Sequence, residues 1–587
     1  MGTGYIKKIS GPVVCAENSR ELAMREMVHV GNEGLIGEVI SIEEKQAIIQ
    51  VYEHTQGLRV GEKIEGTGSP MSVTLGPGLM SNIFDGIARP LSEMAAISGS
   101  FISRGLKVNT IDTDRKWSIK MLSSVGDKAE GGKIFAKTSE TESIVHRIML
   151  PPGINGEITW VAPDGDYKVT ETLLLVKTEN GEIPVTSQQV WPIRTDRPVA
   201  ERKTSVKPLI TGQRVIDSLF PVAKGGAAAI PGGFGTGKTM TQHQIAKWSD
   251  ADIIVYIGCG ERGNEMTQVL EEFEGLTDPR TGRLLLDRTI LIANTSNMPV
   301  AAREASIYTG ITIAEYYRDM GYHVAIMADS TSRWAEALRE ISGRLEEMPA
   351  EEGFPAYLPS RLAGFYERAG YCKTLSGEDG SVTIIGTVSP QGGDFSEPVT
   401  QNTKRFVRAF WALDRSLAYS RHYPAIEWLS SYSEYAPSLE GWYKENAGED
   451  FPSLRGRVLK ILGEESSLME IVKLIGGDVL PDEQKLVLEI ARVIRLGFLQ
   501  QNAFHKIDTY VPVGKQCEMM RIIIYLYEKA KSLVIKGLPV SIIREEGIFE
   551  DIVSMKYNIP TENYEKGFIT LRNKIDAVYN KLYQTQL

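Results

Sequence analysis

Short apolar stretches alternate with polar, glycine-containing turns over the first part of the chain. Alternation of apolar and polar positions with a period of two is typical of β-strands. The predicted strands are separated by turns such as Gly31 to Gly34, and they run over Tyr5 to Ile9, Met27 to Val30, Leu35 to Ile42 and Ala47 to Val51. We expect residues 1–75 to form a small N-terminal β-barrel.

A second strand-rich region follows the segment L-G-P-G-L at Leu75 to Leu79, which ends the first pattern. Its clearest turns are Pro151 to Gly156 and Pro163 to Asp166, where proline, glycine, asparagine and aspartate gather. These residue types favour turns because each tolerates or pre-sets a turn conformation of the backbone. We interpret residues 109–194 as a β-rich insertion domain.

The pattern changes after about Pro208, where apolar runs of five or six residues alternate with helical stretches. Apolar strands alternating with helices are typical of a parallel sheet that is covered on both faces. We therefore predict an α/β domain built from residues 76–108 and 195–440. Its expected strands are Ala227 to Ile230, Ile253 to Gly258, Thr289 to Ala293 and Val324 to Ala328, and its expected helices are Lys238 to Trp248, Pro299 to Met320 and Ser332 to Glu346.

The last part of the chain is mainly helical in its pattern. Helices are predicted at Ser466 to Leu474, Pro481 to Leu499 and Glu518 to Ile535. We expect residues 441–587 to form a C-terminal helical domain. The predicted fold class is thus a multidomain α/β protein, with an N-terminal β-barrel, a β-rich insertion, a parallel α/β core and a helical C-terminal domain.

Composition places this chain among ordinary folded proteins. Its 587 residues correspond to three or four domains at roughly 150 residues each. With 42% hydrophobic and 24% charged residues, disorder is excluded as the main state. The formal net charge of −10 argues against a generic binder of nucleic acid or of an anionic membrane. The function must therefore come from local sites.

The spacing of the cysteines and the lack of long apolar runs indicate a cytoplasmic location. Cys15, Cys259, Cys372 and Cys517 lie far apart without a Cys-x-x-Cys spacing, so neither a disulfide framework nor a zinc site is predicted. The sequence holds no uninterrupted run of 18 apolar residues, and its first ten residues lack the apolar core of a signal peptide. We expect a cytoplasmic protein that touches a membrane only through partners.

The strongest functional signal is the segment G-G-F-G-T-G-K-T at residues 232–239, a full match to the phosphate-loop pattern G-x-x-x-x-G-K-[ST]. Glycines let backbone N–H groups turn toward phosphate oxygens, and the following helix points its positive end at the same place. In this pattern the lysine reaches the β- and γ-phosphates and the threonine hydroxyl binds Mg²⁺. The predicted nucleotide-binding residues are Gly232, Gly233, Phe234, Gly235, Thr236, Gly237, Lys238 and Thr239.

A second segment, V-A-I-M-A-D at Val324 to Asp329, is an apolar run that ends in a carboxylate. Ligands of doubly wound sheets bind outside the carboxyl ends of the strands, so Asp329 is expected to face the phosphate loop. There it would hold Mg²⁺ through water. An apolar run ending in aspartate is common and can equally be a capped strand; the phosphate loop favours the metal role.

The third segment, G-C-G-E-R-G-N-E at Gly258 to Glu265, follows another predicted strand. A carboxylate at this place can polarise the water that attacks the γ-phosphate. Arg262 can stabilise phosphate charge or hold the glutamate in position. We predict Glu261, with Arg262 and Lys238, as the catalytic residues. Glu265 is the alternative, but one helical turn further on it is expected to face a neighbour or to cap the next helix.

Four segments together resemble the catalytic A subunit of V-type and archaeal-type rotary ATPases: Pro231 to Thr239, Gly258 to Glu265, Asn294 to Ile307 and Ala328 to Arg339. The resemblance spans essentially the whole chain. It implies the same roles for the residues already named: Lys238 and Thr239 toward phosphate and Mg²⁺, Glu261 as the catalytic carboxylate with Arg262 beside it, and Asp329 toward the metal.

The resemblance also implies two residues that pack against adenine. These are Tyr423 and Phe504, the latter at the end of Q-Q-N-A-F. The alternative for both is a place in the hydrophobic core, because aromatic side chains are common there.

The function implied by the resemblance is that of one component in a large machine. The chain would bind ATP or ADP with Mg²⁺ at its interface with a homologous, non-catalytic B subunit, in an alternating hexameric ring around central and peripheral stalk subunits. The ring would couple ATP hydrolysis or synthesis to H⁺ or Na⁺ transport through a membrane sector, on whose cytoplasmic face it would sit. The chain has no obvious arginine finger, so the partner is expected to supply it.

A different class of function is a ring translocase, such as a Rho-like RNA helicase or a secretion ATPase. These proteins share the phosphate-loop core and an N-terminal β module. They lack the long insertion between barrel and core, and the acidic composition does not indicate an RNA-binding face. A non-catalytic regulatory role is disfavoured because the phosphate loop, Glu261 and Asp329 are all intact.

Overall fold

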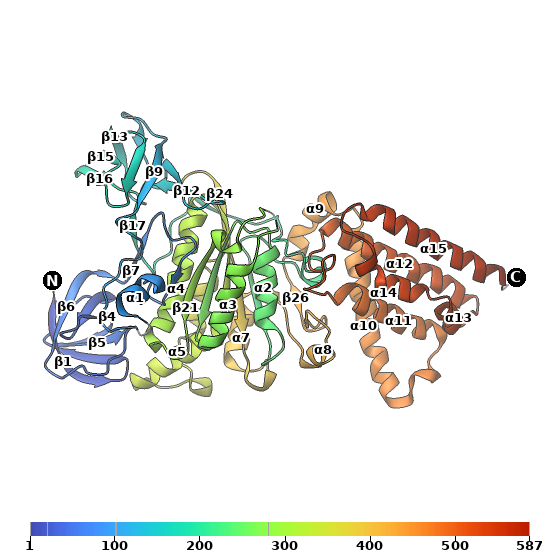
Figure 1. Ribbon diagram of the computed structural model, residues 1–587. Coiled ribbons are helices and arrows are strands. Elements are labelled where there is room, and N and C mark those ends of the chain that lie inside the picture. Colours follow the sequence, from blue (N-terminus) through green and yellow to red (C-terminus); the bar gives the residue numbers. More distant parts are fainter. Residues whose placement is uncertain (1, 20, 100–101, 280, 586–587) are drawn as a thin grey trace.

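The computed structural model describes residues 2–19, 21–99, 102–279 and 281–585. Figure 1 shows an elongated molecule, with the N-terminal barrel at one end, the parallel sheet in the middle and the C-terminal helices at the other end. The insertion projects from the body above the barrel (Figure 1). This architecture confirms the predicted fold class, while the boundaries between the domains stay predictions.

The N-terminal domain is a closed barrel with the strand order β1-β2-β5-β4-β3-β6. Its interior is filled by apolar side chains such as Val28, Val39 and Ile49. The sequence pattern missed β2, whose V-V-C-A run does not alternate, and β6, in which Ile64 is the buried apolar residue. The strands are β1 (Thr3–Ser10), β2 (Val13–Glu17), β3 (Glu26–Val30), β4 (Leu35–Glu43), β5 (Gln46–Val51) and β6 (Lys63–Pro70).

The insertion consists of two four-stranded sheets, ordered β10-β13-β15-β16 and β12-β11-β9-β14. It is joined to the body through β17 (Gln189–Pro192), which pairs with β7 (Ser72–Leu75). Its strands are β9 (Lys116–Met121), β10 (Lys128–Ala129), β11 (Ile134–Ser139), β12 (Val145–Met149), β13 (Gly156–Val161), β14 (Gly165–Lys168), β15 (Leu174–Thr178) and β16 (Gly181–Val185).

The core sheet runs in the order β26-β25-β19-β24-β22-β20-β21-β8 in the described residues. All neighbours from β25 to β8 are parallel. Its strands are β8 (Ile83–Phe84), β19 (Ala227–Pro231), β20 (Ile253–Cys259), β21 (Thr289–Asn294), β22 (His323–Asp329), β24 (Asp379–Val388), β25 (Ala409–Phe410) and β26 (Tyr432–Ser433), with β18 (Glu201–Lys203) and β23 (Gly370–Lys373) on a side branch.

Both faces of this sheet are covered, as predicted. Along β20, Ile254 and Tyr256 belong to the apolar cluster under α2 and α3, whereas Ile253, Val255 and Ile257 belong to the cluster under α4 and α5. The helices of this domain are α1 (Leu91–Ser98), α2 (Lys238–Trp248), α3 (Gly263–Gly275), α4 (Val300–Asp319), α5 (Thr331–Arg344), α6 (Leu358–Tyr366), α7 (Pro398–Phe406) and α8 (Arg415–Tyr419).

The prediction for α2 is confirmed at both ends, and the other predicted core helices differ by one or two residues. Pro299 is the residue before α4 rather than its first residue, and α5 ends at Arg344 instead of Glu346. The pattern gave no bounds for α3, although a helix was expected after Glu265; α3 begins before that residue, at Gly263. The pattern missed β24, because the sequence D-G-S-V-T-I-I-G-T-V mixes glycines and hydroxyls into a strand that lies in the middle of the sheet.

The C-terminal domain is helical, as expected, and its first predicted helix is only part of a longer one. The segment Ser466 to Leu474 is the end of α10, and the segment Pro481 to Leu499 is α11 followed by a π-helical turn at Ile494–Leu499. The helices are α9 (Ala436–Asn446), α10 (Phe451–Ile475), α11 (Asp482–Val493), α12 (Val513–Ile535), α13 (Val540–Glu545), α14 (Ile548–Asn558) and α15 (Tyr564–Thr585). Every described helix of the chain is too short or too polar to span a bilayer.

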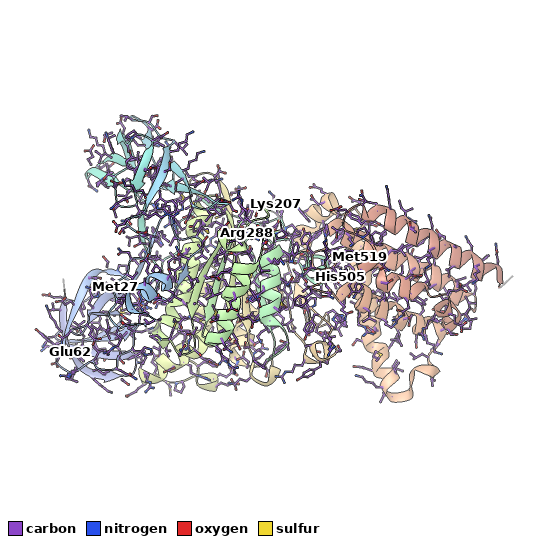
Figure 2. The ribbon with its side chains drawn as sticks, viewed as in Figure 1. Met27, Glu62, Lys207, Arg288, His505 and Met519 are labelled. Atoms are coloured by element: carbon purple, nitrogen blue, oxygen red, sulfur yellow. The ribbon has the colours of Figure 1, made fainter. Side chains whose placement is uncertain are left out.

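A buried ion pair joins the core to this helical domain. The guanidinium of Arg214 lies against the Asp508 carboxylate, and both side chains are fully buried. Arg214 also donates from Nη2 to the carbonyl oxygen of Gln500 at 2.8 Å, and Asp508 accepts the backbone N–H of Asn502 at 2.7 Å. Figure 2 shows His505, from the same loop, where the two domains meet. These bonds hold residues 500–508 against the core.

We predict that Asp508→Ala lowers the free energy of unfolding by about 3 to 5 kcal/mol, because it leaves the Arg214 cation buried without its counter-charge. Urea unfolding of the full chain, followed by circular dichroism, measures this loss. Glu65→Ala is the control, because it removes only an exposed partner of Lys63 and should leave the midpoint unchanged. Equal midpoints for the two variants would contradict a stabilising buried pair.

Candidate active site

The predicted phosphate loop connects β19 to α2. β19 is buried along its whole length between β24 and β25, and α2 begins at Lys238. Two glycines of the loop have left-handed backbone conformations, with φ of 76° at Gly235 and 88° at Gly237. Side-chain-bearing residues rarely adopt such angles, so the glycines let the loop turn its N–H groups inward.

Lys238 lies folded over this loop. Its Nζ donates to the carbonyl oxygens of Gly232 and Gly233 at 2.7 and 2.9 Å. Burial lowers the pKa of Lys238, although the nearby Asp329 and Glu261 carboxylates partly offset this effect. The ammonium group is therefore partly desolvated, at the N-terminus of α2, where an anion is favoured.

Asp329 ends β22 directly beside the loop. Its Oδ2 accepts a hydrogen bond from the Thr239 hydroxyl at 2.9 Å, and its Oδ1 accepts one from the Thr387 hydroxyl at 2.6 Å. The Tyr256 hydroxyl donates to Oδ2 at 3.2 Å. The structure thus brings together the two residues that the sequence assigns to Mg²⁺, although they lie 90 positions apart.

This pair fits a magnesium ion that arrives with a ligand. A hydroxyl and a carboxylate are hard oxygen donors, which Mg²⁺ prefers, and Mg²⁺ in such sites completes its shell with phosphate and water. In the described part of the chain, no group of three or more His, Cys, Asp or Glu side chains is placed to hold a metal by itself. Thr239 and Asp329 therefore suit a metal that bridges protein and phosphate.

Glu261 follows β20 and is half-buried. Burial raises the pKa of its carboxyl to about 7, and the Asp329 charge together with a hydrogen bond to Glu265 acts in the same direction. Arg333 opposes this shift. Glu265 lies in the first turn of α3, so the alternative candidate is a direct neighbour of Glu261 rather than a separate site.

A cavity of about 600 Å³ connects these groups. Sequence reasoning missed three arginines that line it: Arg303 from α4, Arg333 from α5 and Arg415 from α8. The first two lie in the segments Asn294 to Ile307 and Ala328 to Arg339, which carry the family resemblance. That resemblance was the signal in the sequence that could have pointed to them. A cavity with this lining suits a polyanion, and it places that polyanion next to Glu261, a carboxyl group whose pKa lies near neutral pH.

Arg262 and Phe234 lie at the mouth of the cavity. The Phe234 side chain is 81% exposed, and the Arg262 guanidinium carbon lies 6.0 Å from the centre of its ring. Arg262 is itself exposed, at the residue before α3. Both side chains therefore face outward more than inward.

Tyr423 and Phe504 are outside the lining of this cavity, and neither is a core side chain. They are 43% and 86% exposed. A methyl group added at Gly237 would lie 3.5 Å from the Tyr423 ring, so this ring lies beside the phosphate loop. The carbonyl oxygen of Tyr423 accepts the N–H of Gln501 at 2.7 Å, which brings the loop that carries Phe504 to the same place.

Comparison with known families covers most of the chain. Residues 6–68 match the beta-barrel domain of the ATP synthase alpha/beta family, and residues 212–433 match its nucleotide-binding domain. Residues 108–194 match the barrel-sandwich domain of the ATP synthase alpha/beta subunits. Residues 440–542 match the C-terminal domain of V and A type ATP synthase.

Individual relatives match over their whole length. The chain is 60% identical over 581 residues to the V-type ATP synthase alpha chain 2 of Clostridium tetani, covering 99% of this chain and 98% of the relative. It is 58% identical over 583 residues to the V-type ATP synthase alpha chain of Halothermothrix orenii, covering 99% of each. The chain belongs to this V/A-type ATP synthase alpha-chain family. The predicted family, fold and kind of enzyme, an ATP-binding catalytic chain of the synthase, are confirmed.

A solved structure shares the fold of this V/A-type alpha chain but has lower identity. It is the assembled ATPase EscN from the type III secretion system of enteropathogenic E. coli, which is 22% identical. The two superpose with a TM-score of 0.64, over 89% of this chain and 100% of EscN. The secretion ATPases considered from sequence are thus similar in fold.

We predict that Gly237→Ala weakens nucleotide binding about 5- to 30-fold, since the free loop would relax out of the left-handed conformation and returning to it for binding costs about 1 to 2 kcal/mol. Isothermal titration of the full chain with ADP measures the change. Gly441→Ala, inside α9 and facing open space, is the matched control and should bind ADP normally. Unchanged affinity in Gly237→Ala would show that the loop does not need this conformation to bind.

Proposed function

We propose that this chain hydrolyses or synthesises Mg-ATP at the cavity between β19, β20 and β22, with Lys238, Thr239, Asp329 and Glu261 in the roles predicted from sequence. The observation that supports this most is the 2.9 Å contact of the Thr239 hydroxyl with the Asp329 carboxylate. It joins the phosphate loop to the acidic strand end, within one cavity that also holds Glu261.

The phosphate loop binds the triphosphate in this proposal. Its inward N–H groups and the N-terminus of α2 favour phosphate oxygens. The Lys238 ammonium exchanges its bonds with the Gly232 and Gly233 carbonyls for bonds to the β- and γ-phosphates. Because the ammonium is already partly desolvated by burial, this exchange costs less than stripping a fully hydrated cation.

Thr239 and Asp329 would hold the magnesium ion that accompanies the nucleotide. When bound, the ion neutralises charge on the β- and γ-phosphate oxygens. The Thr387 and Tyr256 hydroxyls hold the Asp329 carboxylate in one orientation, so its oxygens stay directed at the loop.

Glu261 accepts the proton of the attacking water in hydrolysis and returns it in synthesis. A carboxyl whose pKa burial raises to about 7 can both take and give a proton near neutral pH. Arg333, which opposes the raised pKa, adds positive charge beside the reacting phosphate. Glu265 shares a hydrogen bond with Glu261 and limits the orientations of its carboxyl group.

Partners complete the site in this proposal. The exposed Phe234 and Arg262 lie at the mouth of the cavity, where a neighbouring protein of the ring would close it. That neighbour is a homologous, non-catalytic B subunit, which alternates with this chain in a hexameric ring and supplies an arginine finger worth about 10³ to 10⁵ in rate. Stalk subunits would connect the ring to a membrane sector that carries H⁺ or Na⁺, on its cytoplasmic face.

The family assignment disfavours the other function considered from sequence, a nucleic-acid or protein translocase. EscN belongs to a secretion system, but the likeness to it is in fold only. The insertion at 108–194 matches an ATP synthase domain, and the acidic net charge of −10 disfavours an RNA-binding surface.

We predict that Glu261→Gln keeps nucleotide affinity within about threefold but lowers turnover of the reconstituted ring at least about 100-fold, because the amide cannot accept the proton. Lys238→Ala should instead weaken ADP affinity about 10- to 100-fold, because it removes a charged phosphate contact. Phosphate release measures turnover, and calorimetry measures binding.

Lys247→Ala, in the last turn of the same helix α2, is the control for both measurements and should behave as the unaltered chain. Near-normal turnover in Glu261→Gln would remove Glu261 from its role. Normal affinity in Lys238→Ala would count against the phosphate-loop assignment.

We also predict that Tyr423→Ala and Phe504→Ala each weaken ADP binding about 5- to 100-fold while leaving the binding of inorganic tripolyphosphate unchanged, because the two rings would stack on the base alone. Competition titrations with both ligands separate the two effects. Tyr419→Ala, an 85% exposed tyrosine in the neighbouring α8, is the control. Equal losses for both ligands would contradict an adenine contact.

A further inference from the structure

Arg303 lies in the first turn of α4, next to the segment Gly260–Glu261 that follows β20. Its side chain lines the cavity of the active site, yet the residue is only 8% exposed. A methyl group added at Gly260 would lie 3.0 Å from Cδ and 3.1 Å from Nε of Arg303, and 2.7 Å from Cβ of Arg333. Two arginine side chains therefore pack against the backbone just before Glu261, on the side where a side chain at Gly260 would lie.

A short run of backbone bonds connects Arg303 to Glu261. Nη2 of Arg303 donates to the carbonyl oxygen of Ser296 at 3.0 Å. The N–H of Ser296 in turn donates to the carbonyl oxygen of Glu261 at 2.9 Å, and the N–H of Gly260 donates to the carbonyl oxygen of Asn294 at 2.7 Å. Residues 294–296 thus hold the backbone of residues 260–261 by hydrogen bonds, and Arg303 bonds this segment to α4.

The position of Arg303 is itself secured by the end of β20. The Ser306 hydroxyl donates to the carbonyl oxygen of Arg303 at 2.7 Å and contacts Sγ of Cys259 at 3.6 Å. Burial raises the pKa of the Cys259 thiol to about 12, so this sulfur stays neutral and adds no charge near Glu261. Nε of Arg303 is buried without a hydrogen-bond partner in the described structure, and it packs against Gly260.

We propose that Arg303 is a positioning residue for Glu261. It supports the Gly260 backbone and fixes Ser296, and these contacts keep the Glu261 carboxyl where it can accept the proton of the attacking water. The inference rests on the proposed function of Glu261. An arginine is required because its Nε can pack against the glycine while another nitrogen of the same rigid guanidinium donates to the Ser296 carbonyl. A lysine ammonium could donate to the Ser296 carbonyl but has no second nitrogen to pack against Gly260.

The test is Arg303→Gln and Arg303→Lys in the full chain, assembled into its ring with its partner proteins. We expect Arg303→Gln to lower kcat about 10- to 100-fold, because a displacement of the order of 1 Å in a catalytic group has effects of that size. KM and the Kd for ADP should change less than about threefold. Arg303→Lys should recover part of the lost kcat. Arg339→Gln, an arginine on α5 packed over Phe354 outside the cavity, is the matched control.

Each outcome decides the question. An unchanged kcat in Arg303→Gln overturns the proposal. A tenfold or larger rise in the Kd for ADP or in KM also overturns it, because Arg303 would then contact the phosphates directly. Thermal melting within a few degrees of the unaltered chain excludes general misfolding. If the unaltered ring itself fails to hydrolyse ATP, the proposed function fails, and this result is distinct from a failure of Arg303 alone.

Discussion

The contact between the Thr239 hydroxyl and the Asp329 carboxylate is the interaction around which the active site is organised. It is possible only because β19 and β22 are parallel and end at the same edge of the sheet, with β24 between them. β24 supplies the Thr387 hydroxyl that holds the second oxygen of Asp329. The phosphate loop, the metal ligands and Glu261 after β20 thus share one edge, where parallel α/β sheets bind their ligands.

Helix α4 connects this edge to the rest of the molecule. Its Thr309 hydroxyl donates to the carbonyl oxygen of Gly86 at 2.9 Å, and its Thr312 hydroxyl donates to that of Ile193 at 3.0 Å. Both acceptors lie in segments that lead from the barrel and the insertion into the core. Arg194 extends this link, because it bonds Glu304 of α4 and Glu38 of the barrel. The helix that carries Arg303 is thus bonded directly to these connecting segments and, through Arg194, to the barrel.

The helical domain meets the core through a different kind of contact. Its loop at 500–508 is held against the core by the buried Arg214–Asp508 pair. Within the helical domain, Lys556 of α14 donates to the carbonyl oxygen of Leu496, just before this loop, at 2.6 Å. Burial lowers the pKa of Lys556 to about 8, so this cation is held at a cost that its backbone acceptors offset. Because Phe504 lies in that loop, these bonds, together with the bond from the Gln501 N–H to the Tyr423 carbonyl, set its position relative to Tyr423 and the phosphate loop.

The sequence by itself determined the order of the domains and the phosphate loop. It also placed Glu261 after the strand β20 and Asp329 at the end of the strand β22. These follow from local pattern, since an apolar strand, a glycine-rich turn and a helix start are each set by neighbouring residues. The sequence did not reveal β24, β2 or β6, whose composition is mixed, and it gave no bounds for α3. Nor did it single out Arg303, Arg333 or Arg415 as cavity residues, or show that Glu265 adjoins Glu261. Those depend on which strands lie side by side and on packing between residues far apart in the chain, and only the tertiary structure decides these.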